Sequence, residues 1–132
     1  MKTIIILIVI AALICIAAGC GNGNKASKAT YQQITQAEAQ RIMDEEEGFV
    51  IVDVRRQDEY DSGHIPGAIL IPNESIDKTP PEELPDFDQT ILVYCRSGNR
   101  SKQAAQKLAD MGYTDIREFG GINTWPGEAT TE

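Results

Sequence analysis

A cysteine followed closely by two arginines is the group of side chains in this 132-residue sequence that is best suited to chemistry. Cys95 follows a continuous apolar run at residues 91–93, which predicts a strand buried on both faces, and precedes a helical pattern at residues 101–111. The polar loop between them therefore joins a strand end to a helix N-terminus, where successive N–H groups and the helix dipole bind anions. These surroundings, with the positive charges of Arg96 and Arg100, favour a low thiol pKa and a thiolate nucleophile at Cys95.

An inert interpretation of Cys95 is open, because cysteine is often buried in protein cores. The five residues that follow Cys95 are all polar or glycine, and this composition argues against apolar burial. We therefore predict a reactive cysteine in an anion-binding loop that consists of Arg96, Ser97, Gly98, Asn99 and Arg100.

Composition limits the partners that this chain can bind. The formal net charge of −8 disfavours nucleic acid and anionic membrane surfaces, although the two loop arginines still allow a small anion to bind locally. Only one histidine, His64, and one cysteine are expected in the folded domain, too few for a usual transition-metal site, so we predict no metal and no other cofactor. For His64 a structural role is favoured, with its ring hydrogen-bonded to the backbone of a glycine- and proline-rich turn.

Residues 1–19 have the features of a targeting segment and not of a folded element. Their apolar run is shorter than the ~20 residues that a membrane-spanning helix needs. Small residues precede Cys20, and the segment resembles a bacterial lipoprotein signal. This resemblance implies cleavage before Cys20, lipid on Cys20, and a membrane-anchored protein in the cell envelope, either periplasmic or on the outer face of the cell membrane. An uncleaved anchor and an ordinary secretory signal are the alternatives.

Residues 20–30 are small, polar and glycine-rich, which predicts a flexible tether.

Residues 31–130 predict one α/β domain. Apolar runs bounded by turn residues indicate strands, and helical periodicity with capping signals indicates helices. The predicted strands are 31–34, 49–54, 69–71, 91–93 and 115–119, and the predicted helices are 36–44, 57–61 and 101–111. A proline-rich connector is expected at 72–89 and a loose tail at 126–132, with Trp125 as a core residue just before it.

Charged side chains follow the second predicted strand. Asp53 interrupts this apolar strand near its carboxyl end, where an aspartate is either functional or a structural hydrogen-bond acceptor. Arg55 and Glu59 have the i,i+4 spacing that suits an ion pair on the short helix 57–61. We therefore expect an Arg55–Glu59 pair that helps to fix this loop.

Four short motifs complete the pattern. They are DVR at 53–55 with Glu59, GHIPGA at 63–68, YCRSGNRS at 94–101, and GGI at 120–122 with Trp125. Together, in this order, they resemble a single-domain rhodanese, which is a sulfurtransferase module. The resemblance implies an α/β fold with a mainly parallel sheet and helices on both of its faces.

The same resemblance implies a mechanism. The Cys95 thiolate would attack the outer sulfur of a small anionic donor such as thiosulfate and carry it as a persulfide, which a thiol or cyanide acceptor would remove. The loop N–H groups would stabilise the donor and the persulfide, and the two loop arginines would attract the anion. The supporting residues, on a neighbouring loop, would be Asp53, Arg55 and Glu59.

Two alternative functions are weighed against this one. Cysteine phosphatases and arsenate reductases have a similar loop, but their arginine comes six residues after the cysteine, whereas here Arg100 comes five after and Ser101 takes the sixth place. The shorter loop is expected to be too tight for phosphate while leaving room for a single sulfur atom. A non-catalytic sulfur-carrier or partner-binding module is the second alternative. Such domains often lack the cysteine, so the presence of Cys95 favours an enzyme.

Overall fold

The computed structural model describes residues 28–132. The predicted signal segment, its cleavage site and the lipidation residue Cys20 lie outside the described residues. Within this range, none of the helices is both long enough and apolar enough to cross a membrane.

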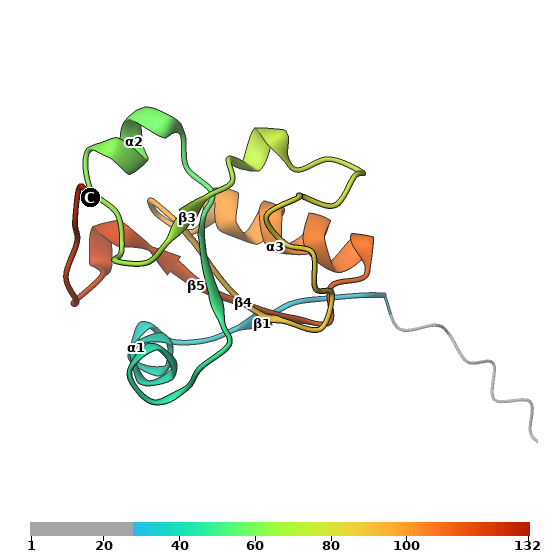
Figure 1. The fold of residues 1–132 in the computed structure, drawn as a ribbon, viewed down its shortest axis with the longest axis horizontal. Helices are drawn as coiled ribbons and strands as arrows, with labels where there is room; N and C mark the ends of the chain where they lie inside the picture. The colour runs from blue at the N-terminus through green and yellow to red at the C-terminus, as the bar shows by residue number, and fades with distance from the viewer. Residues whose placement is uncertain (1–27) are drawn as a thin grey trace, which may run out of the picture.

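A five-stranded parallel sheet forms the centre of the domain (Figure 1). The strand order is β1-β5-β4-β2-β3, and every neighbouring pair is parallel. In chain order the elements are β1 Gln32–Gln33, α1 Gln36–Glu45, β2 Val50–Asp53, α2 Gln57–Asp61, β3 Ile69–Leu70, the 3-10 turn η1 Asn73–Ser75, β4 Thr90–Cys95, α3 Asn99–Met111, β5 Asp115–Gly121, and the 3-10 turn η2 Ile122–Thr124. The predicted α/β fold with a mainly parallel sheet is thereby confirmed.

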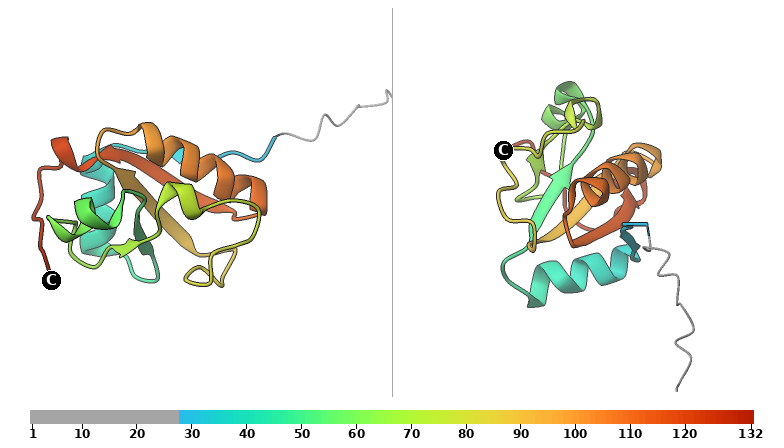
Figure 2. Two further views of the ribbon diagram at one scale, coloured as in Figure 1. Left: turned by 90° about the horizontal axis from the view of Figure 1, so that it is seen from above. Right: turned by 90° about the vertical axis from the view of Figure 1, so that its right-hand side faces the viewer.

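Helices cover both faces of this sheet, with α1 and α3 on opposite sides (Figure 2). Alternate residues of β4 supply the two cores: Ile91 and Val93 pack towards α3, while Leu92 and Tyr94 pack towards α1. Both faces of a central parallel strand are buried in this way, which explains why its sequence is a continuous apolar run and does not alternate. Cys95 is the last residue of β4, so the fold delivers it to the carboxyl edge of the sheet.

The ends of the two long helices follow from local chemistry. Thr35 caps α1, because its hydroxyl accepts the N–H of Glu38 at 3.1 Å. Gly112 ends α3 with a φ of +108°, a conformation that glycine adopts without strain. At its other end α3 begins at Asn99, two residues earlier than predicted, because Gly98 turns the chain into the helix directly after the cysteine loop.

The C-terminal tail is attached to the domain and is not loose, which corrects the prediction. Thr130 exchanges two backbone hydrogen bonds with His64, at 2.8 and 2.7 Å. The His64 ring stacks on Tyr60, and its nitrogens lie 2.9 Å from the Tyr60 carbonyl oxygen and 3.0 Å from that of Glu132. These contacts agree with the structural role expected for His64. Trp125 is only half-buried, on the α1 side of the sheet.

Candidate active site

The loop after β4 curls around the sulfur of Cys95. The N–H of Gly98 donates a hydrogen bond to Cys95 Sγ at 3.0 Å. Gly98 has a φ of +106°, which a residue with a side chain rarely adopts, so glycine is needed at the point where the loop turns back. The result is the cradle of N–H groups at a helix N-terminus that the sequence predicted.

Cys95 itself is buried, with 1 % of its surface exposed, and packs in the core on the α3 side. The expectation that polar neighbours would keep it from burial is therefore wrong, because only its sulfur meets the polar loop. Burial raises the pKa of the Cys95 thiol, but the Ser101 hydroxyl and the N–H groups of Ser101, Gly98 and Ser97 outweigh this effect and leave the pKa below its usual value. The loop thus favours a thiolate by hydrogen bonding, even though the residue is buried.

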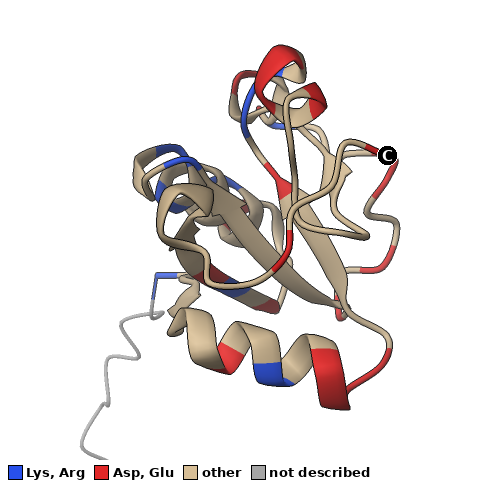
Figure 3. Ribbon diagram, turned by 90° about the vertical axis from the view of Figure 1, so that its left-hand side faces the viewer, with Lys and Arg blue, Asp and Glu red and all other residues tan. Residues whose placement is uncertain are grey.

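The two loop arginines have different surroundings. Arg100 forms two hydrogen bonds with Glu59, at 2.7 and 2.9 Å, and the pair lowers the pKa of Glu59 to about 2. Arg96 is exposed and has no ion pair among residues 28–132. Acidic residues are concentrated on α2 and at the end of α1 (Figure 3). Arg96 is therefore a local positive charge on a chain with a net charge of −8.

The predicted Arg55–Glu59 pair is wrong. Glu59 binds Arg100 from α3, and Arg55 turns inwards to Asp53, with its Nη2 2.6 Å from Oδ2. Arg55 precedes α2 and is not part of it, so the helical i,i+4 geometry does not apply to it.

The Asp53–Arg55 pair lies beneath the loops and is almost fully buried, at 0 % and 5 % exposed. Tyr94 donates its hydroxyl proton to Asp53 at 2.8 Å and accepts the N–H of Ile65 at 3.0 Å, while Arg55 donates to the carbonyl of Gly63 at 2.7 Å. The pair therefore joins the end of β2 to β4 and to the turn at 63–68. No hydrogen bond joins either residue to Cys95, so they support the loops without touching the sulfur.

An Arg55→Leu variant is expected to lose about 3–5 kcal/mol of unfolding free energy, because it leaves the charge of Asp53 buried without a partner. Urea unfolding followed by circular dichroism measures this loss. The neighbouring Arg56→Leu variant is the matched control. The Arg56 side chain is mostly exposed, so its replacement should change the unfolding free energy by no more than about 0.5 kcal/mol. Equal effects from the two substitutions would contradict the supporting role.

Two candidate functional residues in β5 were not among the predicted site residues. The buried carboxylate of Glu118 accepts hydrogen bonds from the Ser101 hydroxyl at 2.6 Å and from the Gly120 N–H at 2.8 Å. At Gly121, a Cβ atom would lie 1.9 Å from the carbonyl oxygen of Arg96. The available signals were an acidic residue directly before Phe119 in a predicted strand and the glycine pair at 120–121, which the sequence analysis used only as part of a motif.

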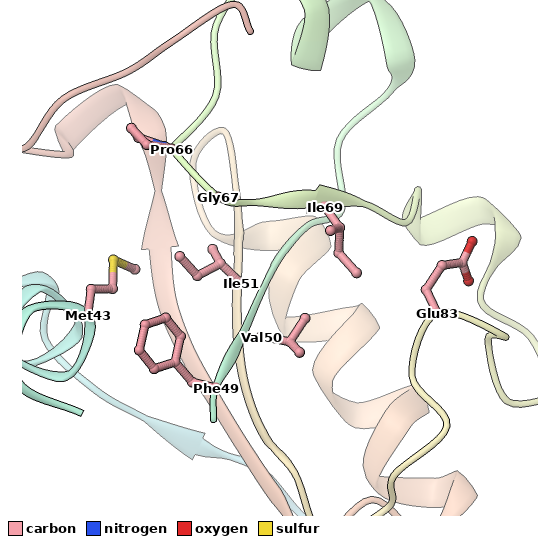
Figure 4. A pocket seen from close by; sticks show the side chains of 8 residues that line it. All are labelled: Met43, Phe49, Val50, Ile51, Pro66, Gly67, Ile69 and Glu83. Carbon is pink, nitrogen blue, oxygen red and sulfur yellow. The ribbon is translucent and has the colours of Figure 1, made fainter. Parts of the chain in front are cut away.

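A cavity of about 330 Å³ is lined by Arg96 of the cysteine loop and by Glu59. A larger one of about 500 Å³ is lined mainly by apolar side chains that include Met43, Phe49 and Pro66 (Figure 4). No residue of the cysteine loop lines this larger cavity, so cavity volume alone does not identify the site at Cys95. Among residues 28–132, no three His, Cys, Asp or Glu side chains converge in a way that could hold a metal ion.

Comparisons with known proteins agree with this architecture. The family model of the rhodanese-like domain matches residues 35–128. The chain is 38 % identical over 71 residues to the thiosulfate sulfurtransferase PspE of Escherichia coli K12, a match that covers 54 % of this chain and 68 % of that protein. It is 33 % identical to the thiosulfate sulfurtransferase GlpE of Pseudoalteromonas translucida, over 72 % of this chain and 89 % of that protein. A solved structure described as an E. coli rhodanese with anions superposes with a TM-score of 0.58 at 32 % identity, over 63 % of this chain and 98 % of the other.

Proposed function

This chain belongs to the rhodanese-like family, and we propose that it is a sulfurtransferase in which Cys95 carries the transferred sulfur as a persulfide. The observation that supports this most directly is the position of Cys95 Sγ, which accepts the Gly98 N–H at 3.0 Å inside a loop of converging N–H groups. Such a loop stabilises negative charge on the sulfur before and after it gains a second sulfur atom.

The proposed reaction has two steps. The Cys95 thiolate attacks the outer sulfur of thiosulfate, the sulfur–sulfur bond of the donor breaks, and sulfite leaves with the bonding electron pair. Cys95 then carries a persulfide anion. In the second step cyanide or a thiolate attacks the outer sulfur, and the Cys95 thiolate is regenerated as the leaving group. Arg96 attracts the anionic donor, because the charge of Arg100 is already compensated by Glu59.

The same ion pair argues against phosphatase or arsenate reductase activity. In a phosphate-binding loop the arginine binds the anion, whereas the guanidinium of Arg100 already donates two hydrogen bonds to Glu59, which compensates its charge. The test is to measure, in one preparation, thiocyanate formation from thiosulfate and cyanide alongside hydrolysis of p-nitrophenyl phosphate. We expect sulfur transfer to exceed ester hydrolysis. Faster ester hydrolysis would overturn the proposal. If Cys95 takes up sulfur that no acceptor can remove, the protein is a sulfur carrier and not a sulfurtransferase.

We further propose the arrangement of the N-terminal region that the sequence implies: a lipoprotein signal at 1–19, a lipid-bearing Cys20 with a tether at 20–30, and the sulfurtransferase domain at 31–130, held outside the cytoplasm. The support is the order of charged, apolar and small residues before Cys20. The lipid would anchor an acidic domain that the membrane surface does not itself attract.

A Cys20→Ser variant expressed in a bacterium is expected to remain uncleaved and without lipid, because the serine hydroxyl cannot form the thioether. Intact mass and detergent partitioning of the membrane fraction measure both effects. Cys15→Ser is the matched control and should be processed as the wild type is, since Cys15 leaves with the signal. Identical processing of Cys20→Ser and wild type would refute lipid attachment at Cys20.

A further inference from the structure

Glu118 is a buried carboxylate that the proposed sulfur transfer does not use. Only 3 % of its surface is exposed, and both groups that donate to it, the Ser101 hydroxyl and the Gly120 N–H, are neutral. Within the part of the chain that the structure describes, it has no ion pair. Burying a carboxylate without a cation costs free energy, and such groups are concentrated at functional sites.

The Ser101 hydroxyl connects Glu118 to the reactive cysteine. Ser101 Oγ lies 2.6 Å from Glu118 Oε1 and 3.4 Å from Cys95 Sγ. A hydroxyl has one proton to give, and the Gly98 carbonyl oxygen, at 2.9 Å, is a further acceptor for it. The bond to the charged Glu118 is the shortest and therefore the strongest of these contacts. The Ser101 hydroxyl lowers the pKa of Cys95 only when it donates its proton to the sulfur. With that proton on the Glu118 side, the Ser101 oxygen instead accepts the S–H of Cys95, and the thiolate loses this donor.

We infer that Glu118 is a positioning residue that competes with Cys95 for the single proton of Ser101 and so restrains the free Cys95 thiolate. Two effects act in the same direction. The Glu118 carboxylate takes a donor that would otherwise stabilise the thiolate, and its own negative charge repels a second negative charge at Sγ. The Gly98 N–H is unaffected and still donates to the sulfur.

Given the proposed sulfur transfer, this restraint acts unequally on the two states of Cys95. In the free thiolate the charge is on Sγ, next to Ser101. In the persulfide it moves to the outer sulfur, one bond further along the side chain. Repulsion from Glu118 is therefore weaker in the loaded state, and Glu118 favours a cysteine that holds sulfur over one that is free and charged.

Among the described residues, the Glu118 side chain forms no ion pair, and its hydrogen bonds are to Ser101 and Gly120, so its substitution removes no partner of the charged groups near Cys95. Arg100, on α3, is a cation close enough to interact with the charge of Cys95, and it is bound by Glu59 of α2 and faced by Glu74 of η1. Arg96, next to Cys95, is exposed and has no ion pair among the described residues. From α1 the neutral Gln36 reaches the same edge, where its amide donates to the carbonyl of Gly121. The effect of a Glu118 substitution can thus be assigned to the Glu118–Ser101–Cys95 chain.

The test is the pH profile of Cys95 alkylation by iodoacetamide in the full chain. The rate is measured from the mass of the proteolytic peptide that contains Cys95. In Glu118→Gln the charge is lost while the shape is kept. We expect alkylation at neutral pH to be about tenfold faster than in wild type, with the profile displaced to lower pH. Glu83→Gln, an exposed carboxylate outside the loop, is the matched control and should leave the profile unchanged.

Further variants separate this inference from a merely structural role. Glu118→Met removes the charge with an apolar side chain suited to burial and should give the same displacement. In a Ser101→Ala background, Glu118→Gln should have a clearly smaller effect on the alkylation profile, because the competition for the Ser101 proton is already absent.

In an unfolded variant, Cys95 would instead titrate like an ordinary cysteine, near pH 8.5. Wild-type or slower alkylation in both folded Glu118 variants overturns the inference. Since alkylation needs no sulfur donor, this outcome is independent of whether the proposed sulfur transfer holds.

Discussion

A Cys95→Ser variant is expected to lose all sulfur transfer from thiosulfate to cyanide, down to the rate of the uncatalysed reaction. Serine has nearly the same shape as cysteine, but its hydroxyl is not ionised at neutral pH and cannot form a persulfide. Thiocyanate formation at saturating thiosulfate measures the loss. No other cysteine lies within residues 28–132, so no second thiol of the domain can replace it.

Thermal unfolding supplies the control for this variant. Cys95 is buried in a polar-lined loop that also accommodates a hydroxyl, so the Tm of Cys95→Ser should stay close to that of wild type. Transfer that persists in a folded Cys95→Ser protein would show that another group carries the sulfur, and the proposed mechanism would have to be abandoned.

Gly121→Ala is expected to reduce sulfur transfer by about 100-fold while the domain stays folded. The added Cβ would lie 1.9 Å from the carbonyl oxygen of Arg96 and 2.5 Å from the backbone nitrogen of Ser97. Both contacts are with backbone, so the cysteine loop itself must move away from β5. Because the loop stabilises the sulfur through aligned N–H groups, a displacement of this kind removes their contribution. The kcat and KM for thiosulfate measure the effect.

Gly48→Ala is the matched control for this substitution. Gly48 has a φ of +78°, so alanine strains the backbone there, but no atom lies within 4 Å of the added Cβ and the position is far from Cys95 in the chain. It should cost some stability and leave kcat unchanged. Wild-type activity in Gly121→Ala would mean that the contact between β5 and the loop does not shape the site.

Local patterns were sufficient to predict most of the fold. The apolar runs of β2 and β4 predicted strands buried on both faces, and the structure places these two strands side by side in the sheet. The helix α2 has the predicted bounds, Gln57–Asp61. The position of Cys95 between a strand and a helix was also visible, because both elements are adjacent to it in the sequence.

Contacts between distant segments account for what the sequence did not reveal. Glu59 and Arg100 are 41 residues apart, and nothing local favours that pair over the nearer Arg55. Glu118 and Ser101 are 17 residues apart and meet only because α3 packs on β5. The tail likewise depends on the backbone pairing of Thr130 with His64. All three contacts depend on how distant segments pack against each other, which periodicity alone does not determine.

The most direct test of the central claim is the intact mass of the purified protein after incubation with thiosulfate under reducing-agent-free, anaerobic conditions. The account predicts a gain of one sulfur atom on Cys95 that disappears when cyanide is added. An unchanged mass in wild-type protein, under conditions where Cys95 is still alkylated by iodoacetamide, would contradict it, because a reactive thiolate that does not accept sulfur from thiosulfate is not the sulfur carrier proposed here.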